Sequence, residues 1–279
     1  MAEPTNKILH IPVELASYVI RHRLMKAFSV FVYLKCYTSG IINKDSVTFK
    51  ALGSTIGVKD NRTLHKYLKQ IIGLNWIGYN TVSGNYFIRS IDKIRVLHNF
   101  KKRQAVTFNV KDLRQIQGFC IASVIGGDIN KHKYFKEVVL KRIDKFAAVK
   151  SGAALQNFLS SPTSYYGKSL KGLSKVLGCS QTTACELKQK AIKAGFLKAK
   201  HHFVRLRLLE KRDYRIRHIL TESYPQLKGK IRFRKKIIKD KKTNTKKAFV
   251  EVVAQLHDEL IPQVKFKKID RFSKINIAA

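Results

Sequence analysis

An internal repeat constrains the fold of this chain more than any other feature. Two segments, Ser46 to Ser90 and Lys168 to Arg207, follow the same pattern. Each begins with a short amphipathic stretch that ends at a glycine, Gly57 or Gly178, and a glycine there permits the left-handed conformation that closes a helix. A polar capping residue then starts a second amphipathic stretch. We therefore expect one helix–turn–helix unit to occur twice.

The spacing of equivalent residues supports this interpretation. Before the turn they lie 121 positions apart, as Gly57 and Gly178 do, and after it 120 apart, as Asp60 and Ser180 do. The turn of the first copy is thus one residue longer. Both copies continue with strand-like runs, which predict a hairpin. The expected strands are 77–80 and 86–89 in the first copy, and 196–198 and 203–206 in the second.

Helix, turn, helix and hairpin in this order resemble the winged helix-turn-helix domains that bind DNA. The resemblance rests on 52–57, 63–72 and 75–77 in the first copy, and on 173–180, 183–184 and 194–197 in the second. It implies a mainly α (α+β) chain with two winged helix-turn-helix domains, a helical connector and a basic C-terminal extension. The expected boundaries are 1–104, 105–160 for the connector, 161–209 and 210–279. The alternative is a pair of helical hairpins in an unrelated bundle.

The segments around the repeats add further expectations. Glu14 to Tyr37 has the apolar spacing of a helix that packs behind a helix–turn–helix. A strand is predicted at Ala105 to Val110. A helix with an interruption at Gly126-Gly127 is predicted from Asp112 to Phe146, as a connector or dimerisation element. Ser160 to Ser164 is typical of a linker, and the apolar spacing from Phe249 to Leu260 predicts a short amphipathic helix.

The charge balance points to a polyanionic partner. The 279 residues contain 56 Lys or Arg and 18 Asp or Glu, a net charge of +38. Double-stranded DNA is the expected ligand, and RNA stays open as an alternative. The sequence has no apolar run long enough for a membrane span and no signal peptide, so we expect no membrane partner and a cytoplasmic, nucleoid-associated protein of a bacterial or phage-infected cell. The spacing of the four cysteines favours reduced thiols over a zinc site.

The second helix of each repeat carries the candidate DNA-reading residues. Helical spacing directs a basic and polar set outward in the first copy and a mixed set in the second. The first set suits phosphates, and Arg62 also suits guanine, whereas the second suits base edges. A solvated helix face is the ordinary alternative. The first set is Arg62, Lys66 and Lys69, flanked by His65 and Gln70, and the second is Thr182, Glu186, Gln189 and Lys193, with Gln181 at the start of the helix.

Other basic residues are expected to follow the DNA backbone. The predicted wing tips contribute Arg89 in the first copy, and Lys198, Lys200, His201 and Arg205 in the second. The segment Gly229 to Lys247 holds ten lysines or arginines and one acid, Asp240. It is interpreted as a phosphate clamp or minor-groove arm, or else as a disordered basic tail. Its candidate contacts are Arg232, Arg234, Lys235 and Lys236.

No motif in the sequence indicates an enzyme. Gly167-Lys168-Ser169 ends like a phosphate-binding loop, but Pro162 stands where that motif needs a glycine. We expect no catalytic residue, no metal and no cofactor. In length, tandem organisation and basicity the chain is similar to phage or plasmid replication initiators. The alternatives are a transcription regulator of a mobile element and a non-specific nucleic-acid-packing or RNA-binding protein. A homodimer and recruited replication or transcription machinery stay open.

Overall fold

The computed structural model describes residues 8–135, 167–201, 203–223, 225, 228–239, 246–255 and 258–269. The chain divides into two compact units. Unit 1 comprises Met1–Thr163, Leu170–Lys198 and Ile261–Ala279, and unit 2 comprises Ser164–Ser169 and Ala199–Leu260. The chain leaves unit 1 along strand β6 (Leu197–Lys200) and returns along β10 (Glu259–Pro262), and these two strands pair. Unit 2 is therefore an insertion between two paired strands.

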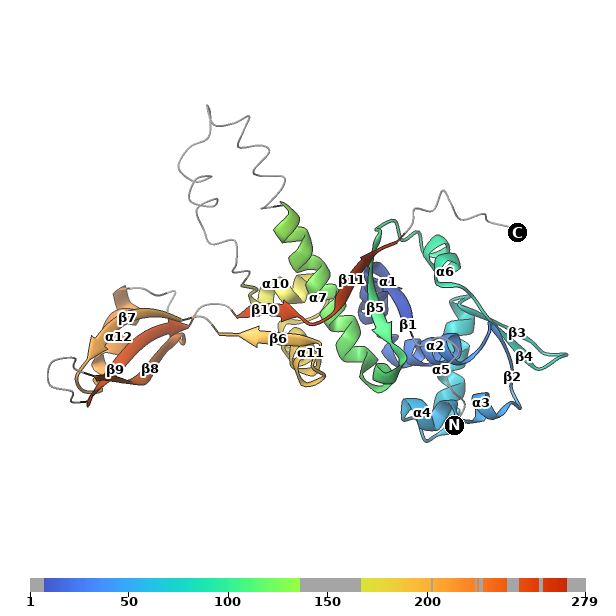
Figure 1. Ribbon diagram of the computed structural model, residues 1–279, viewed down its shortest axis with the longest axis horizontal. Helices are drawn as coiled ribbons and strands as arrows, with labels where there is room; N and C mark the ends of the chain where they lie inside the picture. Colours follow the sequence, from blue (N-terminus) through green and yellow to red (C-terminus); the bar gives the residue numbers. More distant parts are fainter. Residues whose placement is uncertain are drawn as a thin grey trace, which may run out of the picture. The chain divides into compact units, whose positions relative to one another are not determined.

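Unit 1 combines helices with short strands (Figure 1). Its helices are α1 (Val13–Arg21), α2 (Met25–Tyr37), α3 (Val47–Lys50), α4 (Leu52–Ile56), α5 (Asn61–Gly73), α6 (Ile91–Leu97), the 3-10 helix η1 (Val110–Gln115), α7 (Ile116–Tyr134), α10 (Leu170–Leu177) and α11 (Gln181–Lys193). Its strands are β1 (Ile8–Pro12), β2 (Ile41–Asn43), β3 (Ile77–Asn80), β4 (Asn85–Ile88), β5 (Gln104–Asn109) and β11 (Lys265–Lys268).

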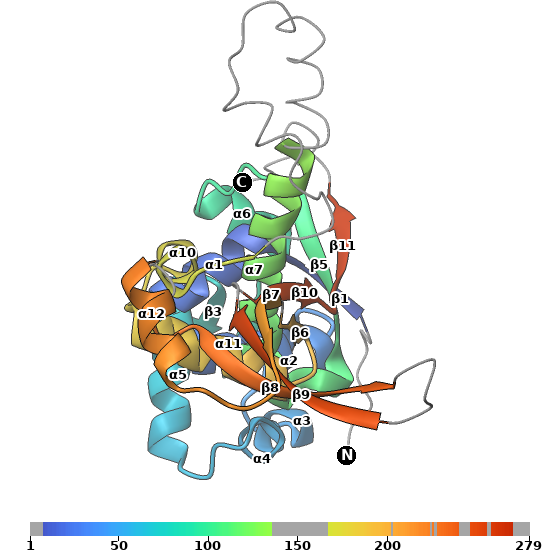
Figure 2. The same ribbon diagram turned by 90° about the vertical axis from the view of Figure 1, so that its left-hand side faces the viewer.

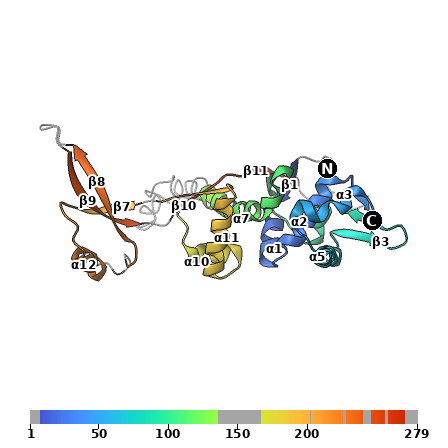
Figure 3. The ribbon, with the colours of Figure 1, turned by 90° about the horizontal axis from the view of Figure 1, so that it is seen from below.

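Unit 2 is a three-stranded antiparallel sheet with one helix. Its elements are β7 (Phe203–Leu209), α12 (Arg215–Ser223), β8 (Ile231–Lys239) and β9 (Lys246–Gln255), with the strand order β7-β9-β8. Helix α12 lies against one face of the sheet (Figures 1 and 3). A small core joins Ile216 and Leu220 of the helix to Ile231 and Val252 of the sheet. Burial of these apolar side chains holds the helix on the sheet.

These elements correct the predicted fold class. The described residues contain four small sheets, so the chain is α+β and the prediction of a mainly α fold is wrong. The region from Gly229 onward accounts for much of the difference. The basic segment forms β8 and the start of β9, and the predicted amphipathic helix from Phe249 to Leu260 falls in β9 and β10. Pairing between strands distant in sequence, and not local periodicity, decides the structure here. The predicted extension 210–279 is shared between the two units.

Helix α7 is a core element of unit 1 and not a connector between two domains. It packs against α1, α2, α10 and α11, and Figures 1 and 3 show it between α1 and α11. The helix runs through Gly126-Gly127 without a break, so the predicted interruption is wrong. A Cβ atom on Gly118 would lie 2.6 Å from the Cβ of Ala194, which shows how closely α11 approaches. The predicted continuation to Phe146 and the linker at 160–164 lie outside the described residues.

Helices α1 and α2 occupy the segment predicted as one helix. The segment Glu14 to Tyr37 breaks at Arg23, which has a φ of 57°. The second helix of this pair, α2, is buried on most of its surface, with Phe28, Phe31 and Leu34 at 0% exposure. It packs against α4 and α5, as predicted for the helix behind the first helix–turn–helix. No helix in the described ranges is long and apolar enough to cross a membrane.

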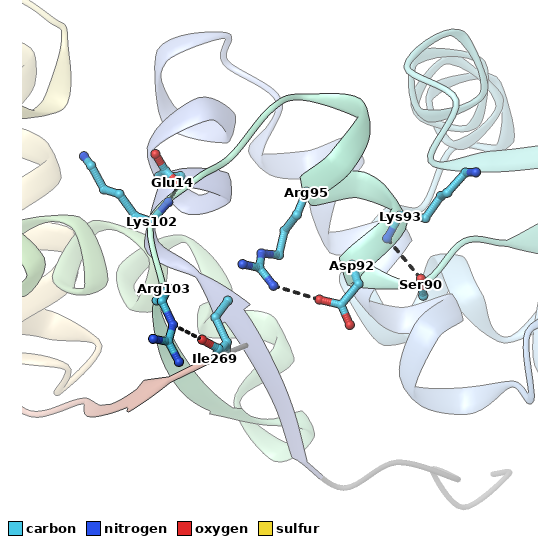
Figure 4. A network of polar contacts seen from close by, with 8 residues as sticks. All are labelled: Glu14, Ser90, Asp92, Lys93, Arg95, Lys102, Arg103 and Ile269. Carbon is cyan, nitrogen blue, oxygen red and sulfur yellow. Dashed lines mark hydrogen bonds and ion pairs between the residues drawn. The ribbon is translucent and has the colours of Figure 1, made fainter. Parts of the chain in front are cut away.

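The sheet β1-β5-β11 joins distant parts of unit 1. Strand β5, predicted at 105–110, pairs antiparallel with β1 on one side and with β11 on the other. Polar contacts fasten its entry (Figure 4). The backbone N–H of Lys102 donates to Glu14 Oε2 at 2.6 Å, and Arg103 Nε donates to the carbonyl of Ile269 at 2.9 Å. The chain after β11 is thereby tied to the beginning of β5.

Candidate nucleic-acid interface

The first helix–turn–helix consists of α4 and α5. Gly57 ends α4 with a φ of 74°, and the N–H of Val58 donates to the carbonyl of Gly53 at 2.8 Å. The Asp60 carboxylate caps α5 by accepting the backbone N–H groups of Arg62 and Thr63, both at 3.1 Å. The hydroxyl of Thr63 also donates to this carboxylate. These hydrogen bonds, that of the Thr63 hydroxyl above all, hold the pKa of Asp60 below its usual value.

The second helix–turn–helix, α10 and α11, repeats these contacts at the matched positions. Gly178 has a φ of 69°, and the N–H of Cys179 donates to the carbonyl of Ser174 at 3.1 Å. Ser180 Oγ caps α11 by accepting the N–H of Thr183 at 3.1 Å. The predicted repeat is therefore confirmed at the level of backbone turns and helix caps.

Helices α5 and α11 end in the same way. Asn75 after α5 and Gly195 after α11 adopt the left-handed conformation, with φ of 57° and 77°. The N–H of the next residue donates back into the helix, from Trp76 to Ile71 at 2.9 Å and from Phe196 to Ala191 at 3.1 Å.

An aromatic residue after each of these two helices packs on a long buried helix. Trp76 lies edge-on to Phe28 and Phe31 of α2, with ring centroids 6.0 and 5.6 Å apart, and Phe196 lies edge-on to Phe119 of α7 at 5.5 Å. The indole N–H of Trp76 donates to His98 Nε2 at 2.8 Å. Burial lowers the pKa of His98, which favours the neutral ring that can accept this bond. Helices α2 and α7 thus have equivalent places in the two halves of unit 1.

The two predicted hairpins have different outcomes. Strands β3 and β4 pair as predicted, with Ile77 opposite Ile88, and β2 adds a third strand. In the second copy the predicted hairpin is wrong, because β6 pairs with β10 and β7 pairs with β9. The two repeats are equivalent instead in one backbone hydrogen bond. The N–H of Gln263, after β10, donates to the carbonyl of Phe196 at 2.8 Å, just as the N–H of Arg89 donates to that of Trp76 at 3.0 Å. Unit 2 occupies the place of the hairpin tip.

The outer face of α5 is basic. Leu64, Leu68 and Ile71 are buried against unit 1, and the candidate residues lie on the opposite side. Arg62, His65, Lys66 and Lys69 are all exposed and line one shallow hollow together with Gln70. The structure therefore brings the first predicted set together. A run of exposed cations on one helix suits contacts with successive phosphates.

The outer face of α11 differs at the matched positions. Thr182 stands where the first copy has Arg62, Glu186 where it has Lys66, and Gln189 where it has Lys69. All three side chains are exposed, as are those of Gln181 and Lys193. An acidic group such as Glu186 repels phosphate, whereas Gln and Glu can hydrogen-bond base edges. The same backbone thus carries a cationic face in one repeat and a mixed polar face in the other.

The hairpin of the first repeat corrects the placement of one candidate, Arg89, and adds a residue that sequence reasoning missed, Lys44. Arg89 lies past the end of β4, and both its Nε and Nη2 donate to Asn75 Oδ1, at 2.9 and 2.7 Å. It therefore braces the end of α5 at the base of the hairpin and not its tip. Lys44, after β2, lies at the tip, where its backbone N–H donates to the carbonyl of Gly84 at 3.1 Å. Only the pairing of β2 with β4 brings Lys44 there.

The remaining candidates belong to the strands around and within unit 2. Lys198 and Lys200 are exposed on β6, and Lys200 Nζ lies 4.0 Å from Glu259. His201 Nδ1 lies 2.7 Å from Asp258 Oδ1. Arg205 on β7 donates to Glu251 Oε1 at 2.5 Å, and this bond is the main cause that lowers the pKa of Glu251. Four candidates lie together on β8: Arg232, Arg234, Lys235 and Lys236.

The described residues contain no cluster of His, Cys, Asp and Glu that could hold a metal ion. All four cysteines are reduced thiols, and Cys36 and Cys120 are buried. Burial raises the pKa of Cys36 to about 11, so its thiol stays protonated at neutral pH and is a poor nucleophile.

Comparisons with protein-family models, with curated proteins and with solved structures find no match to this chain.

Proposed function

We propose that this chain is a double-stranded DNA-binding protein that acts as a replication initiator of a phage or other mobile element. The observation that carries the proposal is the repeated helix–turn–helix, with matched caps, turns and helix ends in one compact unit. In the proposed complex α5 and α11 enter neighbouring major grooves, as the second helix of such a motif does.

The different faces of the two helices support a division of tasks. The cations of α5 would neutralise phosphates, which gives affinity without sequence information. The polar side chains of α11, Gln189 and Glu186 in particular, would hydrogen-bond base edges, which gives sequence preference. A chain with two reading helices can bind an asymmetric site without a second subunit. This is the reason to favour an initiator over a regulator that reads its site as a dimer of single readers.

Footprinting of the full-length protein on fragments of its own genome tests the proposal. The measurement uses about 150 mM salt and excess competitor DNA, which suppress sequence-independent binding. Repeated protected sites beside easily melted DNA would support an initiator. A single protected site over a promoter would replace it with a transcription regulator. Uniform coverage, or a preference for RNA, would overturn site-specific DNA reading altogether.

A further inference from the structure

Unit 2 is inserted where the second repeat would otherwise have a hairpin tip. In the first repeat the chain passes from β3 to β4 through a short turn at 81–84. In the second it passes from β6 to the partner strand β10 only after forming the sheet β7-β9-β8 and helix α12. Wings of this kind contact the DNA backbone beside the reading helix. The inserted sheet is therefore a candidate for such a contact.

The face of the sheet opposite α12 carries regularly spaced cations. Arg232, Arg234 and Lys236 alternate along β8 and therefore point to the same side. Opposite them, Arg232 pairs with Val253 and Arg234 with Glu251, so this side is not the one that packs on α12 through Ile231 and Val252. Side chains two residues apart on a strand are about 6.8 Å apart. That spacing is close to the separation of successive phosphates along one DNA strand.

The charge on this face is only partly neutralised. The acidic residue on this face of the described strands is Glu251. Its Oε1 atom lies 2.5 Å from Arg205 Nε and 3.7 Å from Lys236 Nζ. Arg232 and Arg234 are exposed. Arg232 makes hydrogen bonds to the backbone carbonyls of Gly229 and Ile231, which orient its guanidinium without removing its charge. Two arginines are thus available to an anionic partner.

One aromatic residue of this face is stacked on a cation. The guanidinium of Arg234 lies over the ring of Phe203, with Cζ 3.3 Å from the ring centroid. That face of the Phe203 ring is covered and cannot stack on an unpaired base, which is the usual anchor for single-stranded nucleic acid. Phe249, opposite Lys236, lies on the same side and is half-buried. A guanidinium stacked in this way keeps its N–H edge free for a phosphate.

The ribbon formed by β8 and β9 has a shape that fits duplex DNA. The two strands pair from Ile231–Ala254 to Lys239–Lys246, whereas β7 pairs only as far as Val250. The ribbon therefore continues past β7 (Figure 2). A two-stranded ribbon can follow the backbone and enter the major groove.

We infer that unit 2 is a third DNA-contacting module. The face of its sheet opposite α12, which carries Arg232, Arg234 and Lys236 and is called the open face below, binds the phosphate backbone of duplex DNA with β8 aligned along one strand. Its contacts carry no sequence information. This inference rests on the proposed function, in which α5 and α11 read duplex DNA.

The test measures how the dissociation constant of the full-length protein for a duplex of random sequence changes with salt, from 50 to 200 mM. Each lost phosphate contact lowers the slope of log K against log salt by about 0.9. The double variant Arg232→Gln with Arg234→Gln should lower the slope by about 2, so that affinity varies about tenfold less over this range. The control variant Lys228→Gln with Arg215→Gln loses the same charge away from the open face, in the turn before β8 and on α12. Its slope should stay close to that of the wild type.

A third variant separates binding from folding. Glu251→Gln removes the acid next to Arg205 and Lys236, so it should tighten binding several-fold, which a folding defect would not do. Equal slopes for the two double variants, or weaker binding by Glu251→Gln, would overturn the inference. A larger effect on single-stranded DNA than on duplex would also overturn it. The site-specific footprint is a separate measurement: its loss with an intact slope difference would contradict the proposed function and leave unit 2 as a duplex-binding module.

Discussion

The two repeats of unit 1 have the same backbone and different side chains. Their turns, caps and helix ends are formed by equivalent hydrogen bonds. Their packing differs, because α5 is buried through Leu64, Leu68 and Ile71 whereas α11 is buried through Ala184 and Ala191. The comparison shows that a few glycines and caps are sufficient to define the motif. Its inner and outer faces are then free to diverge.

Small residues allow α11 to lie close to its supporting helix. Gly118 of α7 faces Ala194 and the backbone of Ala191, with no room for a Cβ. In the first repeat large aromatic side chains pack at the corresponding place, where Trp76 contacts Phe28 and Phe31 of α2. The first repeat is therefore held together by large side chains that fill its core, and the second by the close approach of α11 to α7.

The largest effect should come from the core position that the two repeats do not share. Leu68 is 2% exposed, and its equivalent in the second repeat is Lys188. Leu68→Ala should lower the free energy of unfolding by about 2–5 kcal/mol, because it leaves a cavity beneath α5. Lys188→Ala should cost less than this, because shortening a half-buried side chain leaves no enclosed cavity. Urea unfolding of both variants measures this, and equal losses would contradict the difference in packing.

The next effect concerns DNA binding at another matched pair, Lys69 and Gln189. Gln189→Ala should reduce discrimination at one base pair by about 1–3 kcal/mol, because a base-edge hydrogen bond is lost. Lys69→Gln should weaken binding to all sequences alike and reduce the salt slope by about 1. Binding to a panel of single-base-pair variants of the footprinted site distinguishes the two. If both substitutions acted alike, the proposed division of tasks would be wrong.

A smaller effect is expected at the turn glycines. Gly57→Ala and Gly178→Ala should each cost about 1–2 kcal/mol, because both residues have positive φ. Gly178→Ala should cost more, since a Cβ there would lie 2.9 Å from Cγ of Arg21, whereas Gly57 has open space around it. Thermal unfolding of the two variants gives the order. The reverse order would indicate that Arg21 moves away without cost.

The smallest effect distinguishes the two helix caps by pH. Ser180→Ala should cost about 1 kcal/mol at every pH, because a hydroxyl cap does not titrate. The pKa of Asp60 is lowered in the folded protein, so its cap stabilises the fold at neutral pH and loses this effect as the pH falls through that lowered pKa. The melting temperature of Asp60→Ser should therefore approach that of the wild type below about pH 4. A constant difference across pH would show that the Asp60 charge has no part in the cap.

Local signals in the sequence predicted the helices of both repeats, and non-local pairing decided the rest. Gly57, Gly178, Asp60 and Ser180 act within a few residues of their own positions, so their role can be read directly from the sequence. The second hairpin was predicted from the strand-like run at 203–206, which does form a strand. Its partner is β9 and not β6, and nothing local to the run distinguishes the two.

The candidate site shows the same limit. The outward sets of α5 and α11 follow from helical spacing and are found exposed as predicted. The sequence predicts Arg89 at a wing tip, as the last residue of the expected strand 86–89, but its contact with Asn75 depends on the left-handed end of α5. Lys44 reaches the tip through the pairing of Asn43 with Asn85. Such contacts join residues far apart in the sequence, and no periodic pattern in the sequence predicts them.

The insertion of unit 2 has a consequence for the order of folding during synthesis. The first repeat is contiguous, so α2, α4, α5 and its hairpin can assemble as soon as β4 has left the ribosome. The second repeat cannot pair β6 until β10 has been made, which requires all of unit 2 to emerge first. Contacts between distant segments form slowly because a long loop must close. The nascent chain therefore has a paired hairpin in the first repeat while α11 still lacks its closing strand.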